Sequence, residues 1–237
     1  MQMKIWDNLR YGIQEDMAMV LGIYGSGGAG KEVKEIAEEL GQWDEIVFID
    51  DAVQPDIFKG IRRMPFDAFM VHFSPQRAEI IISLGEPAYK VMLREKAESF
   101  GYRLANVIHT MAWVSPTAKL GRGITLRAGV IINADAELED GVTVMEYSAI
   151  GHDSVIGENA QIASGVLVGG HCIIGKNSYI ATGVPVKNGV KIGHDSVVGI
   201  GAAVLRDIPD NVIALGNPAR AMKNKDDKKI FEGGKKC

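Results

Sequence analysis

Cysteine is nearly absent from this chain of 237 residues, which contains only Cys172 and Cys237. Two cysteines cannot build a disulfide framework or a cysteine-based zinc site, and the sequence predicts no bound metal. No apolar run approaches the ~18 residues that a membrane-spanning helix needs. Residues 1–11 also lack the uninterrupted apolar core of a signal peptide. We therefore expect a cytoplasmic protein without membrane insertion.

An excess of positive charge is also missing. The chain has 26 lysines and arginines against 30 acidic residues, which gives a formal net charge of −4. Binding to a phosphate backbone needs a basic patch or stripe, so we expect no nucleic acid partner.

What the chain has in abundance is a repeat with a period of six. Every sixth residue, starting at Ile108 and ending at Val204, is isoleucine, leucine or valine, and the fourth residue after each is small or β-branched. An α-helix cannot use this period, because the apolar residues would rotate around its surface. Three units of one short strand and one turn can close a triangular coil. The repeat predicts a left-handed parallel β-helix of about six coils.

The segment before the repeat has a different pattern. Residues 19–24 form an apolar run that leads into glycine-rich residues 25–30 and then into a stretch with helical apolar spacing. A second apolar run, 46–49, ends in two aspartates. Strand, glycine turn and helix, followed by a strand with an acidic end, are typical of a Rossmann-like nucleotide-binding unit. The predicted substrate-binding residues are Gly25, Ser26, Gly27, Gly28, Asp50, Asp51 and Gly85.

The size of this unit limits its ligand. A third strand is expected over 79–84 and a helix over 87–98, which gives about 85 residues and room for about four parallel strands. That is small for a full dinucleotide fold, so a mononucleotide or nucleotide sugar is favoured over NAD.

The patterns divide the chain into four segments. We expect an N-terminal extension over 1–17, either an extra helix or a partner-binding arm, and the Rossmann-like nucleotide-sugar-binding domain over 18–106. The β-helix is expected over 107–216, and a C-terminal cap and polar tail over 217–237. Lys223 is expected to begin the tail, which is rich in lysine and predicted to be disordered.

Two short stretches, 150–157 (IGHDSVIG) and 214–220 (ALGNPAR), add to this organisation. With them, the chain resembles the bacterial sugar O- and N-acetyltransferases that include sialic acid O-acetyltransferase and the UDP-4-amino-sugar N-acetyltransferase of bacillosamine synthesis. The resemblance implies a homotrimer with acetyl-CoA, the acyl donor, in the groove between neighbouring β-helices. It implies N-acetylation of a UDP- or dTDP-linked 4-amino sugar, with O-acetylation of sialic acid or another sugar hydroxyl as the alternative.

Five histidines compete for the role of general base, and two of them lie in near-identical octapeptides. Seven repeats separate His152 from His194, and because seven is not a multiple of three, the two are expected on different faces of the prism. The family places its histidine near the middle of the β-helix, before an acidic residue, where His152 and Asp153 stand. Gly170 follows three repeats later, directly above His152, where a thioester would have space and a backbone N–H.

The resemblance also implies coenzyme contacts, namely Gly170, Gln161, Thr182, Arg220 and Lys223. The chain departs from the family pattern at three positions. Gly151 stands where glutamate is frequent, Met145 replaces an asparagine, and Gln161 replaces a second histidine.

Other chemistries fit less well. There is no G-x-S-x-G elbow, and neither cysteine precedes a plausible base, so direct acyl transfer is favoured over an acyl-enzyme. A β-helix metalloenzyme of the carbonic anhydrase type needs two histidines five residues apart, and no pair has that spacing. A non-catalytic oligomeric scaffold that binds nucleotide remains an alternative.

Overall fold

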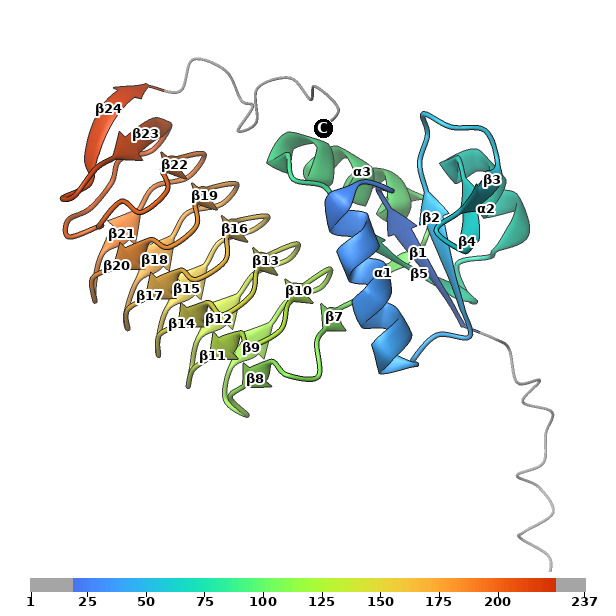
Figure 1. Ribbon diagram of the computed structural model, residues 1–237, viewed down its shortest axis with the longest axis horizontal. Helices are drawn as coiled ribbons and strands as arrows, with labels where there is room; N and C mark the ends of the chain where they lie inside the picture. Colours follow the sequence, from blue (N-terminus) through green and yellow to red (C-terminus); the bar gives the residue numbers. More distant parts are fainter. Residues whose placement is uncertain (1–18, 225–237) are drawn as a thin grey trace, which may run out of the picture.

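Two differently built parts follow one another in the computed structural model, which describes residues 19–224 (Figure 1). An α/β unit comes first, and a rod of stacked short strands follows it. The predicted fold class, a Rossmann-like unit followed by a left-handed parallel β-helix, is confirmed. The expected extension over 1–17 and the tail beyond 224 lie outside the described residues. Within 19–224, no helix is both long and apolar enough to cross a membrane.

The α/β unit contains six strands and three helices. In chain order they are β1 (Val20–Tyr24), α1 (Gly28–Leu40), β2 (Glu45–Ile49), β3 (Asp56–Phe58), β4 (Ile61–Met64), α2 (Phe66–His72), β5 (Ala78–Ile82), α3 (Pro87–Ser99) and β6 (Arg103–Leu104).

Helices cover both faces of this sheet because the side chains of its strands alternate between two apolar clusters. Leu21 and Ile23 of β1 pack with Val33 and Ile36 of α1 on one face. On the other face, Val20 and Tyr24 belong to a cluster with residues of α2 and α3. The strand order is β3-β4-β2-β1-β5-β6.

The sheet is larger than the four parallel strands expected. Five strands are parallel, and β3 pairs antiparallel with β4 at the edge. The turn between them uses Lys59 at φ 50° and Gly60 at φ 82°. The strands of the hairpin mix apolar and charged residues and lack the unbroken apolar run by which a buried strand is recognised, and β6 has only two residues.

The β-helix has three faces, each a stack of two-residue strands. The first face contains β7 (Val107–Ile108), β10 (Thr125–Leu126), β13 (Thr143–Val144), β16 (Gln161–Ile162), β19 (Tyr179–Ile180) and β22 (Val197–Val198). The second contains β8 (Trp113–Val114), β11 (Ile131–Ile132), β14 (Ala149–Ile150), β17 (Leu167–Val168) and β20 (Pro185–Val186). The third contains β9 (Lys119–Leu120), β12 (Glu137–Leu138), β15 (Val155–Ile156), β18 (Ile173–Ile174) and β21 (Lys191–Ile192).

The six-residue repeat produces this stacking directly. Each strand pairs in parallel with the strand three repeats away, so Ile150 lies between Ile132 and Val168. The repeated aliphatic residues point inward and are buried, and Ile132, Ile150 and Ile156 are fully inaccessible. Several corners place Asp, Asn or His in the left-handed region, as at Asp153 and His171, both at φ 57°. These residue types tolerate that conformation better than most.

The end of the rod differs from the prediction at Lys223. The prediction that Lys223 begins a disordered tail is wrong, because its backbone belongs to β24 (Arg220–Asn224), which pairs antiparallel with β23 (Val212–Leu215). Strand β23 is the last strand on the first face, and pairing with β24 occupies backbone groups that its position at the edge would otherwise leave open.

The α/β unit packs against the first face of the β-helix. Lys90 of α3 donates hydrogen bonds to Gly141 O at 2.7 Å and Thr143 Oγ1 at 3.0 Å. Gln161 of β16 donates to Gly85 O. Ion pairs also reach the two corners that flank this face, at Arg127 with Glu32 and at Glu158 with Arg94.

The remaining corner, between the second and third faces, includes residues 151–154 and 169–172. We call it the outer corner. Among the described residues, no hydrogen bond or ion pair joins the α/β unit to it.

Lys90 makes the stability of this packing depend on pH. Burial, with repulsion from Arg94 in second place, lowers the pKa of Lys90 to about 7, whereas an unfolded chain holds lysine near a pKa of ~10.4. At a pH between these two pKa values, Lys90 is protonated in the unfolded chain and neutral in the folded one. The contribution of Lys90 to the free energy of unfolding therefore rises with pH. Urea unfolding at pH 7.5 and 9.5 should show a smaller rise for Lys90→Met than for the unsubstituted protein.

Lys191→Met is the control, because Lys191 is exposed. If Lys90→Met shows the same rise as Lys191→Met, the pH dependence arises from other groups.

Candidate active site

His152 and Asp153 lie together on the outer corner, in the turn between β14 and β15. Asp153 Oδ2 lies 2.7 Å from His152 Nδ1. A carboxylate at this distance accepts the Nδ1–H and leaves Nε2 with a free lone pair, which is the tautomer of a general base. Hydrogen bonding from His152, followed by attraction from both nearby imidazoles, lowers the pKa of Asp153.

Gly170 lies against the imidazole of His152, as its place three repeats later predicted. A Cβ atom at Gly170 would be 2.6 Å from Nε2 and 2.7 Å from Cε1 of His152. The neighbouring His171 N–H donates to His152 O at 2.8 Å, which joins the two coils at this point. Glycine is therefore required here if the imidazole is to keep its position.

His171 completes the cluster and was not predicted. Its Nε2 lies 3.8 Å from Asp153 Oδ2. Its ring meets that of His152 edge to face, with centroids 4.9 Å apart and an interplanar angle of 88°. The signal was present in the sequence, because His171 follows Asp153 by three whole repeats and so stacks on it.

His194, the sequence twin of His152, lies elsewhere as predicted. It follows β21, at the corner between the third and first faces. Its Nδ1 faces Asp195 Oδ2 at 2.8 Å and its Nε2 faces Asp210 Oδ2 at 3.1 Å. Carboxylates therefore occupy both ring nitrogens, and neither is free to take a proton from a substrate.

The predicted nucleotide residues meet at the carboxyl ends of β1 and β2. Gly25 adopts φ 117°, and its carbonyl oxygen approaches Gly30 so closely that a side chain at Gly30 would clash. A Cβ at Gly27 or Gly28 would meet no atom within 4 Å, so the start of α1 is open. Ser26 donates a hydrogen bond to Asp50.

Asp51 is tied to the protein more tightly than predicted. It accepts from the Tyr24 hydroxyl at 2.5 Å, Lys96 at 2.9 Å and the Phe66 N–H at 2.8 Å. Partial burial raises the pKa of Asp51, but these hydrogen bonds outweigh it and hold the pKa below its usual range. The Asp51 carboxylate is thus held by three groups of the protein. The Asp50 carboxylate instead accepts a hydrogen bond from Ser26 in the glycine turn.

Four cationic side chains near this turn were missed by the sequence analysis. Lys31, Lys34 and Lys59 line a groove of about 430 Å³ that includes Gly28 and also the acidic Glu32 and Glu35. Arg63 Nη1 donates to Ser26 Oγ at 3.3 Å. Lys31 lies on the predicted helix, but Lys59 and Arg63 belong to the unpredicted β3–β4 hairpin, so no pattern in the sequence placed them here.

The predicted coenzyme residues are dispersed. Gln161 is buried and bonded to Gly85, which brings one predicted coenzyme residue to one predicted substrate residue. Thr182 follows β19 at the corner between the first and second faces. Arg220 and Lys223 belong to β24 at the end of the rod. Only Gly170 of this set adjoins His152 within one chain.

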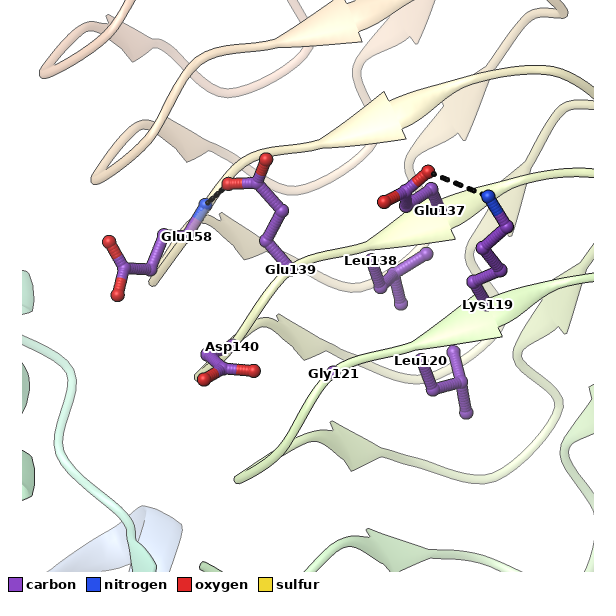
Figure 2. A pocket seen from close by; sticks show the side chains of 8 residues that line it. All are labelled: Lys119, Leu120, Gly121, Glu137, Leu138, Glu139, Asp140 and Glu158. Atoms are coloured by element: carbon purple, nitrogen blue, oxygen red, sulfur yellow. Dashed lines mark hydrogen bonds and ion pairs between the residues drawn. The ribbon is translucent and has the colours of Figure 1, made fainter. Parts of the chain in front are cut away.

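A hollow of about 380 Å³ lies on the third face, and none of the predicted residues lines it. Figure 2 shows the side chains around it. Carboxylates of Glu137, Glu139, Asp140 and Glu158 surround it, and Lys119 pairs with Glu137 at 3.5 Å. This excess of negative charge opposes the binding of a phosphate-rich ligand.

Comparisons with known proteins agree with both parts of the fold. The family model described as the PglD N-terminal domain matches residues 20–97, and that of the bacterial transferase hexapeptide (six repeats) matches residues 135–170.

Solved structures resemble the chain over most of its length. The acetyltransferase domain of PglB from Neisseria gonorrhoeae, in complex with acetyl coenzyme A, is 32% identical, with a TM-score of 0.82 over 86% of this chain and 100% of that one. PerB from Caulobacter crescentus, in complex with CoA and GDP-perosamine, is 30% identical, with a TM-score of 0.77 over 86% and 97%. WeeI from Acinetobacter baumannii is 25% identical, with a TM-score of 0.81 over 86% and 100%.

The contact at Gly170 generates a prediction. In Gly170→Ala the new methyl group should force the imidazole of His152 away and break its hydrogen bond with Asp153. The fold should persist, because Gly170 does not have a positive φ and the imidazole is exposed. In ¹H–¹⁵N spectra of the imidazole nitrogens, we expect the His152 signals to move and those of His194 to stay. Unchanged His152 signals would contradict the contact.

Proposed function

Because the chain belongs to the family of hexapeptide-repeat sugar acetyltransferases, we propose that it transfers acetyl from acetyl-CoA to the amino group of a nucleotide-linked amino sugar. The observation that carries the proposal is the His152–Asp153 pair beneath Gly170, in a chain that also has an open glycine turn for a nucleotide. We further propose a UDP- or dTDP-linked 4-amino sugar as the acceptor.

His152 acts in this proposal as the general base. Its Nε2 takes a proton from the amino group as the nitrogen attacks the thioester carbonyl, and Asp153 steadies the imidazolium that forms. The carbon–sulfur bond then breaks, and the thiolate of the coenzyme leaves and takes the proton from the imidazolium, which restores neutral His152. The exposed position of the imidazole supports access by two large substrates from outside the rod.

Gly170 has a second role in the proposal. Within the described part of the chain its N–H has no hydrogen-bond acceptor, and we assign it to the oxyanion that develops on the thioester oxygen. Thr182, Arg220 and Lys223 are retained as proposed coenzyme contacts. The buried Gln161 is better suited to holding the Gly85 loop, through its hydrogen bond to Gly85 O.

The start of α1 is the proposed site for the diphosphate of the sugar nucleotide. Open backbone at Gly27 and Gly28 lets the N–H groups of the first turn approach a phosphate. In the adjoining groove three lysines, Lys31, Lys34 and Lys59, outnumber two glutamates, Glu32 and Glu35, so the groove carries a small excess of positive charge. Asp50, together with Ser26, is proposed to contact the nucleoside.

The position of His152 supports a shared active site. The α/β unit of a chain lies on the first face, whereas His152 is on the outer corner, so the rod separates the nucleotide site from the base. We therefore propose a homotrimer in which the sugar nucleotide held by one chain meets His152 of a neighbour.

The second face, which borders the outer corner, carries a surface suited to this assembly. Trp113, Ile131 and Leu167 are aligned by strand pairing, with Ala149 between the last two. These three large side chains remain 52%, 42% and 56% exposed. A continuous exposed apolar row favours burial against another copy.

Loss of the base should abolish most of the reaction. We expect His152→Ala to lower kcat by ~10²–10⁴-fold, the usual contribution of general-base catalysis. His194→Ala removes the sequence twin at another corner and should retain activity. The assay follows acetylated product with acetyl-CoA and UDP-, dTDP- and GDP-linked amino sugars, with free sialic acid as the hydroxyl acceptor. Full activity of His152→Ala would sink the assignment, and product from sialic acid alone would make the enzyme an O-acetyltransferase.

The apolar row predicts the assembly state. Leu167→Glu should dissociate the trimer, because it places a charge among side chains that the interface buries. Val71→Glu is the matched control, since Val71 is an exposed apolar residue on α2, away from the row. Analytical ultracentrifugation should give three chains for the control and one for Leu167→Glu. A stable monomer for the unsubstituted protein would overturn the shared site.

A further inference from the structure

We propose that His152, Asp153 and His171 bind a divalent transition-metal ion such as Zn²⁺, and that the bound ion switches off His152 as a base. The metal site rests on the geometry of the cluster alone. Its regulatory consequence rests on the proposed function.

Ligand atoms of the three side chains already converge. One donor atom from each residue lies within 4.8 Å of the other two. The separations are 2.7 Å from His152 Nδ1 to Asp153 Oδ2 and 3.8 Å from that oxygen to His171 Nε2. Ligands on neighbouring vertices of tetrahedral zinc lie ~3.3 Å apart, given bonds of about 2.0 Å. Small side-chain rotations bring the observed distances to this value.

The backbone holds the cluster in place. His171 occupies the position of Asp153 one coil later, with the same φ of 57°. Its N–H donates to His152 O at 2.8 Å, and the Asp153 N–H donates to Ala134 O at 3.0 Å. Because main-chain hydrogen bonds between coils fix these residues, metal binding needs no reorganisation of the backbone.

The chemistry of the set favours zinc over calcium or magnesium. Two imidazoles and one carboxylate suit zinc and its neighbours in the transition series, whereas the harder cations prefer oxygen ligands alone. All three side chains are exposed, so a fourth position is open to water.

The twin corner lacks this capacity. His194 faces Asp195 and Asp210, and among the described residues no second imidazole joins it. The chain therefore contains the same HDSV sequence in two settings, only one of which has a second imidazole beside the pair. The presence of His171 at one corner, and of no second imidazole at the other within residues 19–224, is therefore what gives the first corner three suitable metal ligands.

Metal binding and base catalysis are mutually exclusive at His152. In the active tautomer the proton is on Nδ1, held by Asp153, and the lone pair of Nε2 is free. A metal ion coordinated by Nδ1 takes the lone pair there, and a neutral imidazole then carries its proton on Nε2. Nε2 can no longer accept a proton from the acceptor, and Asp153 is occupied by the metal.

The binding test uses the full chain with Cys237→Ser, which removes the terminal thiol as a competing ligand. Isothermal calorimetry with zinc chloride should show one site per chain. His171→Asn should weaken it by at least about tenfold, because loss of even an outer hydrogen-bond partner costs that much in metal sites. Asparagine tolerates the left-handed backbone at this position. His194→Asn is the matched control and should bind normally. Absence of zinc binding, or equal binding by His171→Asn, would overturn the site.

The inhibition test measures acetylated product by mass spectrometry, because zinc also binds the thiol of released coenzyme. Zinc should lower the kcat of the unsubstituted protein reversibly, with recovery after a chelator is added, and His171→Asn should lose a smaller fraction of its own zinc-free rate at the same zinc concentration. Equal inhibition of both proteins would overturn the switch. Zinc binding that depends on His171 in a protein without transferase activity would instead refute the proposed function and leave the site intact.

Discussion

The main-chain hydrogen bonds between successive coils determine the rest of this structure. Each coil returns after three repeats, so a residue lies directly above its counterpart. The main-chain bonds join it to the residue next to that counterpart, as His171 N–H bonds to His152 O and Gly151 N–H to Val168 O. Side chains consequently form columns on a rigid surface. One column places Gly170 against His152 and another places His171 against Asp153. The chemistry of the outer corner follows from these two columns, since neither requires a flexible loop to close.

The sequence predicted most of what followed from this period and missed contacts that the period does not encode. The repeat located the β-helix, separated His152 from His194 and brought Gly170 to His152. His171 was missed although it stacks on Asp153 one coil later. The β3–β4 hairpin was not predicted because its strands are short and mix apolar with charged residues, so Lys59 and Arg63 were missed as well. From the sequence alone, Lys90 is expected to be a solvent-exposed lysine on a helix. Its burial arises only when α3 packs on the first face.

Two faces of the rod show how one repeat serves two kinds of contact. The first face presents Thr125, Thr143 and Gln161, and the buried Thr125 and Gln161 lie beneath the α/β unit. Polar groups in such a setting must find partners, as Gln161 finds Gly85 and Thr143 finds Lys90. These hydrogen bonds favour the placement of the α/β unit on this face. The second face is apolar in the same positions, so in the proposed trimer its row of Trp113, Ile131 and Leu167 would supply apolar burial without directional hydrogen bonds.

The return of the chain after every third repeat also bears on how proteins of this shape change in length. Adding or deleting one whole coil beyond His171 leaves every earlier column intact, whereas a change of a single repeat moves all later side chains to a different face. Chains of this architecture can therefore lengthen or shorten in steps of three repeats without moving His152, and near-identical octapeptides such as those around His152 and His194 can lie at corners with different surroundings.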